Sequence, residues 1–354
     1  MRIVEIITGL GLGGSETALA RRLKYQPPGV RTTVVNTLPH LDHYSGQVRR
    51  YAQNLIDIEF SRISARSLDS LLRDSEPDVV VTHSPRETLR LQRVRLPNSL
   101  RHVAVVHSSS ASPNRHHEWP VTALLCLVNH RIAMHVAVSG SAAQGHQCFG
   151  ARRIDVVPVG AEIGDTLPFT SPWPPGTRVR LLTLSRLFRQ KNVHSLIAAI
   201  GHLAPLMRSV GVHTCVFGDG DQRANLSATI ERKGLRDLIS LKQSISDPSP
   251  LLREADALIV PSTAEGGPIT VYEALLAGTR VLSTPVGIVP DLFSNDSGLL
   301  IAKSPSVTDL EASLASMVQM EPVGNAEREQ RAQRFCHLHT RQTSQKFYEA
   351  IQHA

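Results

Sequence analysis

The sequence predicts an α/β protein built from two doubly wound, Rossmann-like domains in tandem. At 354 residues the chain is long enough for two domains, each with a buried core. Short runs rich in β-branched residues alternate with longer amphipathic segments in both halves, which is typical of strand–helix–strand units. A proline-rich stretch, 160–176, interrupts the alternation and indicates a connection between domains.

The first half holds the first set of expected elements. Most of its strand candidates are nearly continuous apolar runs, as expected for parallel strands that are covered on both faces. These candidates are 3–8, 32–37, 79–82, 102–106, 135–138 and 154–157. Amphipathic segments at 15–25 and 139–149 predict helices between strands.

The second half repeats this rhythm after the proline-rich stretch. Strands are expected at 180–184, 214–217, 239–242, 257–260, 280–283 and 299–301. Helices are expected at 193–210, 221–233, 269–277 and 307–320. The polar tail, 326–351, predicts one long helix or a pair of helices. A ligand site is expected by default in the cleft between the two domains.

Composition excludes several classes of protein. Apolar residues make up 41% of the chain and charged residues 19%, which excludes a disordered chain. Aromatic residues, at 4%, are too few for stacking on single-stranded nucleic acid, and the net charge of +7 accompanies no nucleic-acid recognition motif. The four cysteines form no Cys-x-x-Cys pair, so neither a disulfide framework nor a structural zinc site is expected.

The same reading predicts a cytoplasmic location. Glu5 interrupts the first apolar run, which argues against a signal peptide. The longest apolar stretch, 121–128, is too short to span a bilayer. The basic surface could still rest on anionic lipid at the inner face of a membrane.

A glycine-rich turn follows the first expected strand. Gly9, Gly11 and Gly14 have the spacing of a dinucleotide-binding fingerprint, and Gly13 and Gly14 lead into a helix. Such a turn lets a phosphate or a sugar approach backbone N–H groups at a helix start. The second strand ends without the carboxylate that a nicotinamide site needs, so a phosphate or sugar loop and a purely structural turn stay open.

Two glutamates flank a Gly-Gly-Pro turn in the second half. Glu265 is expected in a loop after a strand, and Glu273 inside the helix that starts at Pro268. A carboxylate accepts two neighbouring hydroxyls, so Glu273 suits a ribose diol and Glu265 a sugar. The helix start would offer free amides and a favourable dipole to an anion. These amides are those of Gly267, Ile269 and Thr270. The alternative is an ordinary helix with an acidic start.

A basic pair follows the first strand of the second half. Arg186 and Lys191 leave the same strand end, and both could reach one diphosphate and stabilise its charge as it departs. A solvated basic loop is the alternative. The pairs His116-His117 and His337-x-His339 lack a helical zinc spacing, so no metal is expected.

Together these motifs resemble the retaining GT-B glycosyltransferases of family 4, also called the group 1 family. The resemblance rests on the Glu265-x7-Glu273 spacing and on several shorter segments in family order over nearly the whole chain. These segments are 13–16, 186–191, 217–220 and 286–291. The chain departs from the family at 158–162, Pro-Val-Gly-Ala-Glu, and where Gly266-Gly267 runs directly into Pro268.

The resemblance implies a role for each matching residue. Gly13 and Gly14 resemble the loop that closes on the donor phosphate and sugar, and His107 matches the family's active-site histidine beside the donor sugar. Arg186 and Lys191 resemble the pyrophosphate clamp. The remaining donor-binding positions are Glu265 for the sugar, Gly266, Gly267, Pro268, Ile269 and Thr270 for the hydroxyls and diphosphate, and Glu273 for the ribose.

The resemblance also implies a domain plan. It comprises an acceptor domain at 1–163, a linker at 164–177, a nucleotide-sugar domain at 178–330 and a C-terminal helix at 331–354 that returns toward the first domain. The two domains would face each other across a cleft.

The implied reaction is transfer of a sugar, preferably from a UDP-sugar, to an acceptor hydroxyl with retention at the anomeric carbon. The departing phosphate oxygen would take the acceptor proton, with no metal or other cofactor. The acceptor would be a glycan, a lipid-linked or a small molecule, in bacterial surface-glycan or other glycoconjugate synthesis. A same-fold epimerase or phosphorylase, or a non-catalytic sugar-binding relative, remains as an alternative.

Overall fold

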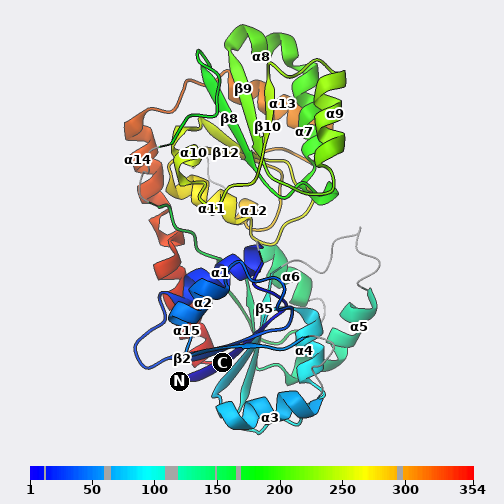
Figure 1. Cartoon of the computed structure of the whole chain (residues 1–354), viewed down its shortest axis with the longest axis vertical. Coiled ribbons are helices and arrows are strands. Elements are labelled where there is room, and N and C mark those ends of the chain that lie inside the picture. The colour runs from blue at the N-terminus through cyan, green and yellow to red at the C-terminus, as the bar shows by residue number, and fades with distance from the viewer. Residues whose placement is uncertain (12, 60–64, 108–118, 148–149, 165–168, 293–297) are drawn as a thin grey trace. The chain divides into compact units, whose positions relative to one another are not determined.

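The computed structural model describes the chain except for residues 12, 60–64, 108–118, 148–149, 165–168 and 293–297 (Figure 1). It divides into two compact units. Unit 1 comprises residues 1–160 and 338–354, and unit 2 comprises residues 161–337. Each unit is a parallel sheet covered by helices, as the alternating pattern predicts.

In the described part of unit 1, seven strands form one parallel sheet in the order β3-β2-β1-β4-β5-β6-β7. Its strands are β1 Arg2–Ile7, β2 Arg31–Asn36, β3 Asn54–Asp57, β4 Val79–Thr82, β5 Arg101–Val106, β6 Met134–Ala137 and β7 Ile154–Val156. Strand β1 pairs with both β2 and β4, so the direction of winding reverses there. Ligand sites of open parallel sheets lie beyond the strand ends at such a reversal.

Helices cover both faces of this sheet. They are α1 Gly14–Leu23, α2 Ser45–Tyr51, α3 Ala65–Ser75, α4 Pro85–Leu91, α5 Trp119–Val128, α6 Gly140–Gln147 and α15 Thr340–Gln352, with a 3₁₀ turn at Asn129–Arg131. In β1, Val4 and Ile6 pack with α3 and α4, whereas Ile7 packs with α1. Because strand side chains alternate, Glu5 shares the α1 face with Ile7.

In the described part of unit 2, six strands form a second parallel sheet in the order β10-β9-β8-β11-β12-β13. Its strands are β8 Val179–Leu184, β9 Val212–Phe217, β10 Ile239–Lys242, β11 Ala257–Val260, β12 Arg280–Ser283 and β13 Leu299–Ile301. Its helices are α7 Val193–His202, α8 Ala204–Val210, α9 Arg223–Arg232, α10 Ser249–Glu254, α11 Ile269–Leu276, α12 Val289–Leu292, α13 Val307–Val318 and α14 Asn325–Arg334, with 3₁₀ turns at Arg189–Lys191 and Cys336–Leu338. Apolar residues of β8, β9, β11, α7, α9 and α13 share one core.

The helix expected at 193–210 is wrong as a single helix. The segment forms α7 and α8, bent by 76° at their junction. Pro205 lies in the first turn of α8. Its ring cannot donate to an earlier carbonyl and clashes with the preceding turn, so a continuous helix would be broken there. In the described part of the chain no single helix has the length and hydropathy of a membrane span, and only α7 with α8, as a bent pair, passes that test together.

The stretch expected to be a linker packs within unit 2 where the structure describes it. The Trp173 indole is buried and donates to the carbonyl of Leu181 at 3.3 Å. Gly164 N donates to Ser249 Oγ at 2.9 Å. Unit 1 ends earlier, at Gly160, whose backbone lies so close to Thr340 of α15 that a Cβ would collide with it.

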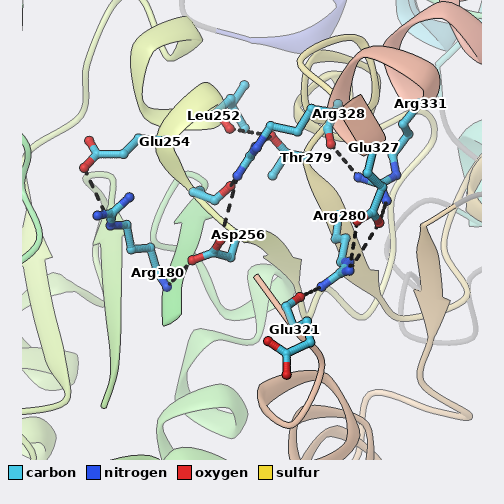
Figure 2. Close-up of polar contacts among 12 residues, drawn as sticks. Arg180, Leu252, Glu254, Asp256, Thr279, Arg280, Glu321, Glu327, Arg328 and Arg331 are labelled. Carbon is cyan, nitrogen blue, oxygen red and sulfur yellow. Dashed lines mark hydrogen bonds and ion pairs between the residues drawn. The ribbon is translucent and has the colours of Figure 1, made fainter. Parts of the chain in front are cut away.

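The polar tail forms the helix pair α14 and α15. Helix α15 contacts α1, where the Arg22 guanidinium lies 3.7 Å from the centre of the Phe347 ring. Helix α14 is held on unit 2 by the buried Arg331 and the partly buried Arg328 (Figure 2). Arg331 donates to the carbonyl of Gly278 at 2.5 Å, and Arg328 donates to the carbonyl of Ala255 at 2.7 Å.

Candidate active site

The expected site residues follow the carboxyl ends of strands in both units. Gly13 and Gly14 follow β1, and His107 follows β5. Lys191 follows β8, and Glu265 follows β11. Because all strands of each sheet are parallel, these positions share one edge of their own sheet.

Lys191 and Glu265 form an ion pair in unit 2. Lys191 Nζ lies 2.5 Å from Glu265 Oε1, and both side chains are mostly buried. Ser262 Oγ donates to the same carboxylate oxygen at 2.8 Å. The structure therefore brings together the two residues expected to hold the donor phosphate and the donor sugar.

The turn that carries Lys191 is fastened to the loop that carries Glu265. Thr263 N donates to the carbonyl of Gln190 at 2.9 Å, and Gln190 Nε2 donates to the carbonyl of Ala264 at 2.6 Å. Asn192, whose φ is +55°, donates to the carbonyl of Pro261 at 2.9 Å. These bonds fix the spacing between ammonium and carboxylate before any ligand binds.

The Gly-Gly-Pro turn delivers the chain to α11. Pro268 occupies the cap position rather than the first helical residue, and no side chain caps the helix. Gly287 has a φ of +55°, and a Cβ there would collide with the carbonyl oxygen of Gly266. Gly287 therefore lets the following loop pack directly on this turn. Ile269 and Thr270 open the helix, and their amides belong to its first turn.

Glu273 lies inside α11, as expected, and it is buried, with only 4% of its surface exposed. Arg186, in contrast, is exposed, and its guanidinium lies 5.4 Å from the centre of the Phe188 ring. The structure places both near the expected strand and helix ends. It shows Lys191, but not Arg186, in contact with Glu265.

The Gly-Asp-Gly segment shapes the loop that carries Arg186. A Cβ at Gly218 would collide with the carbonyl oxygen of Ser185, and Gly220 has a φ of +151° against Leu187. Leu187 N donates to the carbonyl of Asp219 at 2.7 Å. These glycines are thus required for close packing of two strand ends, a role that the family order alone does not indicate.

In unit 1, Gly13 caps α1 and Gly14 is its first residue. A Cβ at Gly13 would collide with the Glu16 carboxylate. Thr17 Oγ1 donates to the carbonyl of Gly13 at 2.7 Å. The turn is therefore compact, and the Glu16 carboxylate packs against its backbone at the start of the helix.

His107 ends a chain of hydrogen-bonded side chains. Its Nε2 lies 3.1 Å from His83 Nδ1, and the two ring planes are inclined by 22° with centres 5.4 Å apart. His83 Nε2 lies 2.8 Å from Glu5 Oε2, which also accepts from Arg22. This series of hydrogen-bonded side chains thus runs from β1 through the end of β4 to the end of β5. Glu5 is fully buried, and His83 and Arg22 are buried as well.

Electrostatics in this chain favour ionised Glu5 and neutral His107. Burial alone would raise the pKa of Glu5, but Arg22 and the hydrogen bond from His83 outweigh it and lower that pKa below 4.5. Burial lowers the pKa of His107 well below 6.5, and the positive charge of Arg22 acts in the same direction. His107 therefore stays neutral at physiological pH.

Sequence reasoning missed Glu5, Arg22 and His83 as parts of the site. A signal was present, because a carboxylate inside a buried strand needs a partner. The pattern alone does not say which of the later residues supplies it. The alternation of side chains in β1 places Glu5 on the face covered by the helix that carries Arg22. It does not predict the contact with His83.

The two histidines of the His337-x-His339 pair each contact the backbone. His339 caps α15 and accepts from Arg341 N at 3.2 Å, whereas His337 contacts the carbonyl of Arg334 at 3.2 Å. Among the described residues, no group of three or more potential metal ligands occurs. His116, His117 and Glu118 lie outside the described residues.

Sequence comparisons relate part of the chain to glycosyltransferases. Residues 170–334 match the family model described as glycosyl transferases group 1. A putative colanic acid biosynthesis glycosyltransferase, WcaL of Escherichia coli K12, is 26% identical over 162 residues, covering 43% of this chain and 39% of that protein. The lipopolysaccharide glucosyltransferase WaaG of the same strain is 30% identical over 145 residues, covering 40% and 38%. The chain thus spans about two fifths of the length of these relatives.

Solved structures match the whole chain. Anabaena HepE, solved in complex with UDP and glucose, has a TM-score of 0.79 at 16% identity and covers 100% of both chains. The sucrose-phosphate synthase of Thermosynechococcus elongatus has a TM-score of 0.79 at 14% identity, covering 100% of this chain and 98% of that one. The chain therefore has the fold of the GT-B glycosyltransferases, with its match to the group 1 family over residues 170–334.

Proposed function

We propose that this protein is a glycosyltransferase that moves a sugar from a nucleotide-sugar donor, preferably a UDP-sugar, to an acceptor hydroxyl with retention at the anomeric carbon. The observation that carries the proposal is the Lys191–Glu265 ion pair, which the structure fastens beside the start of α11. The group 1 match over this region and the UDP-bound structure of HepE support it.

In this proposal the ion pair is the resting form of the donor site. The diphosphate would replace the Glu265 carboxylate as the partner of Lys191, because two phosphate groups offer more charge to the ammonium. Glu265 would then be free to accept hydrogen bonds from sugar hydroxyls. Glu273 would bind the ribose, and the amides at the start of α11 would hold the phosphate oxygens.

The reaction follows from these contacts. The bond from the anomeric carbon to the phosphate oxygen breaks first, and Lys191 and Arg186 stabilise the charge that builds on the diphosphate. The acceptor oxygen attacks from the same face and passes its proton to the departing phosphate oxygen. The two side chains and the helix start supply positive charge, so we propose turnover that does not need a metal ion. His107 would accept a hydrogen bond from a sugar hydroxyl as a neutral ring.

The acceptor is proposed by class. WcaL and WaaG are named for colanic acid and lipopolysaccharide synthesis, so we propose a glycan, a lipid-linked or a small-molecule acceptor in bacterial glycan assembly. Contact with a membrane surface fits this class. Leu124 and Leu127 of α5 have 50% and 69% of their surface exposed, and α5 packs beside α4, which precedes the exposed Arg93 and Arg95 (Figure 1).

The proposal is tested by a donor screen. The full chain is incubated with UDP-, GDP- and ADP-sugars, and release of nucleoside diphosphate and the shift in melting temperature are measured with and without EDTA. A UDP-sugar should raise the melting temperature and be turned over in the presence of EDTA. Isomerisation of the donor sugar without release of nucleoside diphosphate would indicate an epimerase, and formation of sugar 1-phosphate from added inorganic phosphate would indicate a phosphorylase. Absence of any donor binding would indicate a non-catalytic relative.

Lys191→Ala tests the clamp. Loss of one charge donor at the transition state should lower kcat by roughly a hundredfold, measured by steady-state kinetics with the best donor. Lys233→Ala, at an exposed position of unit 2, is the matched control and should leave kcat unchanged. Activity of Lys191→Ala within a few-fold of the parent chain would refute the clamp.

A further inference from the structure

We propose that Glu5 and His83 are positioning residues that hold His107 in one tautomer, with its proton on Nε2 and its lone pair on Nδ1. The inference rests on the proposed function, in which His107 lies beside the donor sugar. It assigns a task to Glu5, Arg22 and His83, three buried side chains that lie outside the group 1 motifs.

The order of the protons follows from the first member of the chain. The ionised Glu5 carboxylate has no proton to give, and its Oε2 accepts from both Arg22 and His83. His83 must therefore carry its proton on Nε2. A neutral imidazole then has only a lone pair on Nδ1, and this atom faces His107 Nε2 at 3.1 Å. His107 must supply the proton of that hydrogen bond.

The alternative order requires a cationic His83. A ring protonated on both nitrogens would donate to Glu5 and to His107, and His107 would then carry its proton on Nδ1. This order places a second positive charge in a buried cluster in which Arg22 already balances Glu5. An uncompensated charge in the interior is costly, so the neutral order is favoured.

The neutral order has a chemical consequence at His107. In a catalytic triad, an unbalanced carboxylate stabilises the imidazolium and makes the histidine a base. Here the Arg22 guanidinium neutralises the carboxylate, so the chain orients His107 without making it basic. The low pKa of His107 agrees with this arrangement. Nδ1 of His107 becomes a fixed acceptor for a hydroxyl donor.

Position in the fold explains why the three residues can meet. Strand β1 lies beside β4, and β4 lies beside β5, so their carboxyl ends are neighbours (Figure 1). Glu5 lies inside β1 and points to the α1 face, where Arg22 is located. His83 directly follows β4, and His107 directly follows β5. Rigid strands therefore hold the three groups, which is the requirement for precise orientation.

The first test is a direct measurement of the tautomer in the full chain without ligand. Long-range ¹H–¹⁵N spectra of the imidazoles show which nitrogen of each ring carries the proton, and His107→Gln identifies the His107 signals among those of the 16 histidines. Both His107 and His83 should show a proton on Nε2 alone at pH 7 to 8. A His107 proton on Nδ1, or a mixture, would overturn the inference whether or not any variant folds.

The second test separates orientation from simple support of the fold. His83→Gln keeps an amide near the Nε2 position of the lost ring but no group at Nδ1, so His107 should show both tautomers. Its kcat with the best donor should fall by at least about tenfold, with KM for the donor little changed. His83→Asn retains an oxygen at the Nδ1 position and should recover part of the loss.

The control is another buried histidine of β5. His102 forms hydrogen bonds with Thr82 and Gln92 at 2.9 and 3.0 Å. It is not part of the hydrogen-bonded series that links Glu5, His83 and His107. His102→Gln should lower the melting temperature yet leave the His107 tautomer unchanged. If His83→Gln also leaves that tautomer unchanged, His83 does not set it and the inference fails. A fixed tautomer in a protein that turns over no nucleotide sugar would instead contradict the proposed function alone.

Discussion

Glu5 and Glu87 are two buried carboxylates of unit 1 with opposite surroundings. Glu5 has a guanidinium and an imidazole as partners, and these lower its pKa. Glu87, on α4, accepts from Thr8 Oγ1 at 2.6 Å, but its burial outweighs this hydrogen bond and the interaction with Arg90. Burial therefore raises the pKa of Glu87 from 4.5 to about 7. The pKa values of these two buried carboxylates are thus shifted in opposite directions.

Glu87 predicts a pH dependence of stability. Its pKa is higher in the folded than in the unfolded chain, so the folded state binds more protons between about pH 4.5 and 7. The contribution of Glu87 to the free energy of unfolding is therefore fully present below pH 4.5 and is lost as pH rises through 7. The loss amounts to at most about 3 kcal/mol. Glu87→Gln does not titrate and should escape this loss.

The measurement is urea unfolding of the parent chain and of Glu87→Gln at pH 5 and pH 8, followed by circular dichroism. The variant should gain stability relative to the parent chain at pH 8 but not at pH 5. Glu349→Gln, at an exposed position of α15, is the matched control. Equal pH dependence in the parent chain and in Glu87→Gln would show that Glu87 is ionised in the folded state at both pH values.

At the scale of elements, α14 shows how a very polar helix is held on a sheet. Arg331 donates to the carbonyl of Gly278 and, at 2.5 Å, to Glu327 of the same helix. Glu327 also accepts from Arg280 of β12 at 3.2 Å (Figure 2). A Cβ at Gly278 would collide with the backbone of Arg328. The helix is thus attached by charged hydrogen bonds and close backbone contact rather than by an apolar stripe.

Arg331→Met tests this attachment. Loss of the charged bond to Gly278 should lower the free energy of unfolding of unit 2 by about 2 kcal/mol. In a Trp119→Phe background Trp173 is the only tryptophan, so its fluorescence in urea reports unit 2. Arg334→Met makes the same change at an exposed position of α14 and should cost less than about 0.5 kcal/mol. Equal losses in the two variants would show that Arg331 does not anchor the helix.

At the scale of the whole molecule, the proposed contact with a membrane predicts lipid-dependent sedimentation. The full chain should bind vesicles that contain anionic lipid more strongly than neutral vesicles, and salt should weaken the binding. Leu127→Glu removes an apolar side chain from the exposed surface of α5 and adds a repelled charge, so binding should fall by at least about tenfold.

The matched control is Ile245→Glu, which makes the same kind of change at an exposed apolar residue of unit 2. It should leave vesicle binding unchanged. Absence of binding to anionic vesicles at low salt would contradict the proposed contact. So would a loss in Ile245→Glu as large as that in Leu127→Glu, because the effect would not then be specific to α5.

Much of the fold could be predicted because local patterns carry it. Apolar runs such as 79–82 and 257–260 form strands at the expected places, since a strand buried on both faces leaves little choice of residue type. The short strand β3 and helices α2 and α10 were not expected, because each mixes polar and apolar residues over too few positions to form an apolar run or a full helical period. Proline chemistry predicts the break at Pro205, but the apolar pattern on both sides of it favours a single helix.

By itself the sequence determined the two parallel sheets, the strand ends that bear Lys191, Glu265 and His107, and the glycines that keep the turns compact. These depend on residue type and spacing within a few positions of the chain. Only the tertiary structure decided that Lys191 contacts Glu265 while Arg186 lies on Phe188, and that Glu5 reaches His107 through His83. The contacts of Lys191 with Glu265, of Glu5 with His83 and of His83 with His107 join residues 24 to 78 positions apart. Their geometry comes from strand order and packing, which a local sequence pattern does not contain.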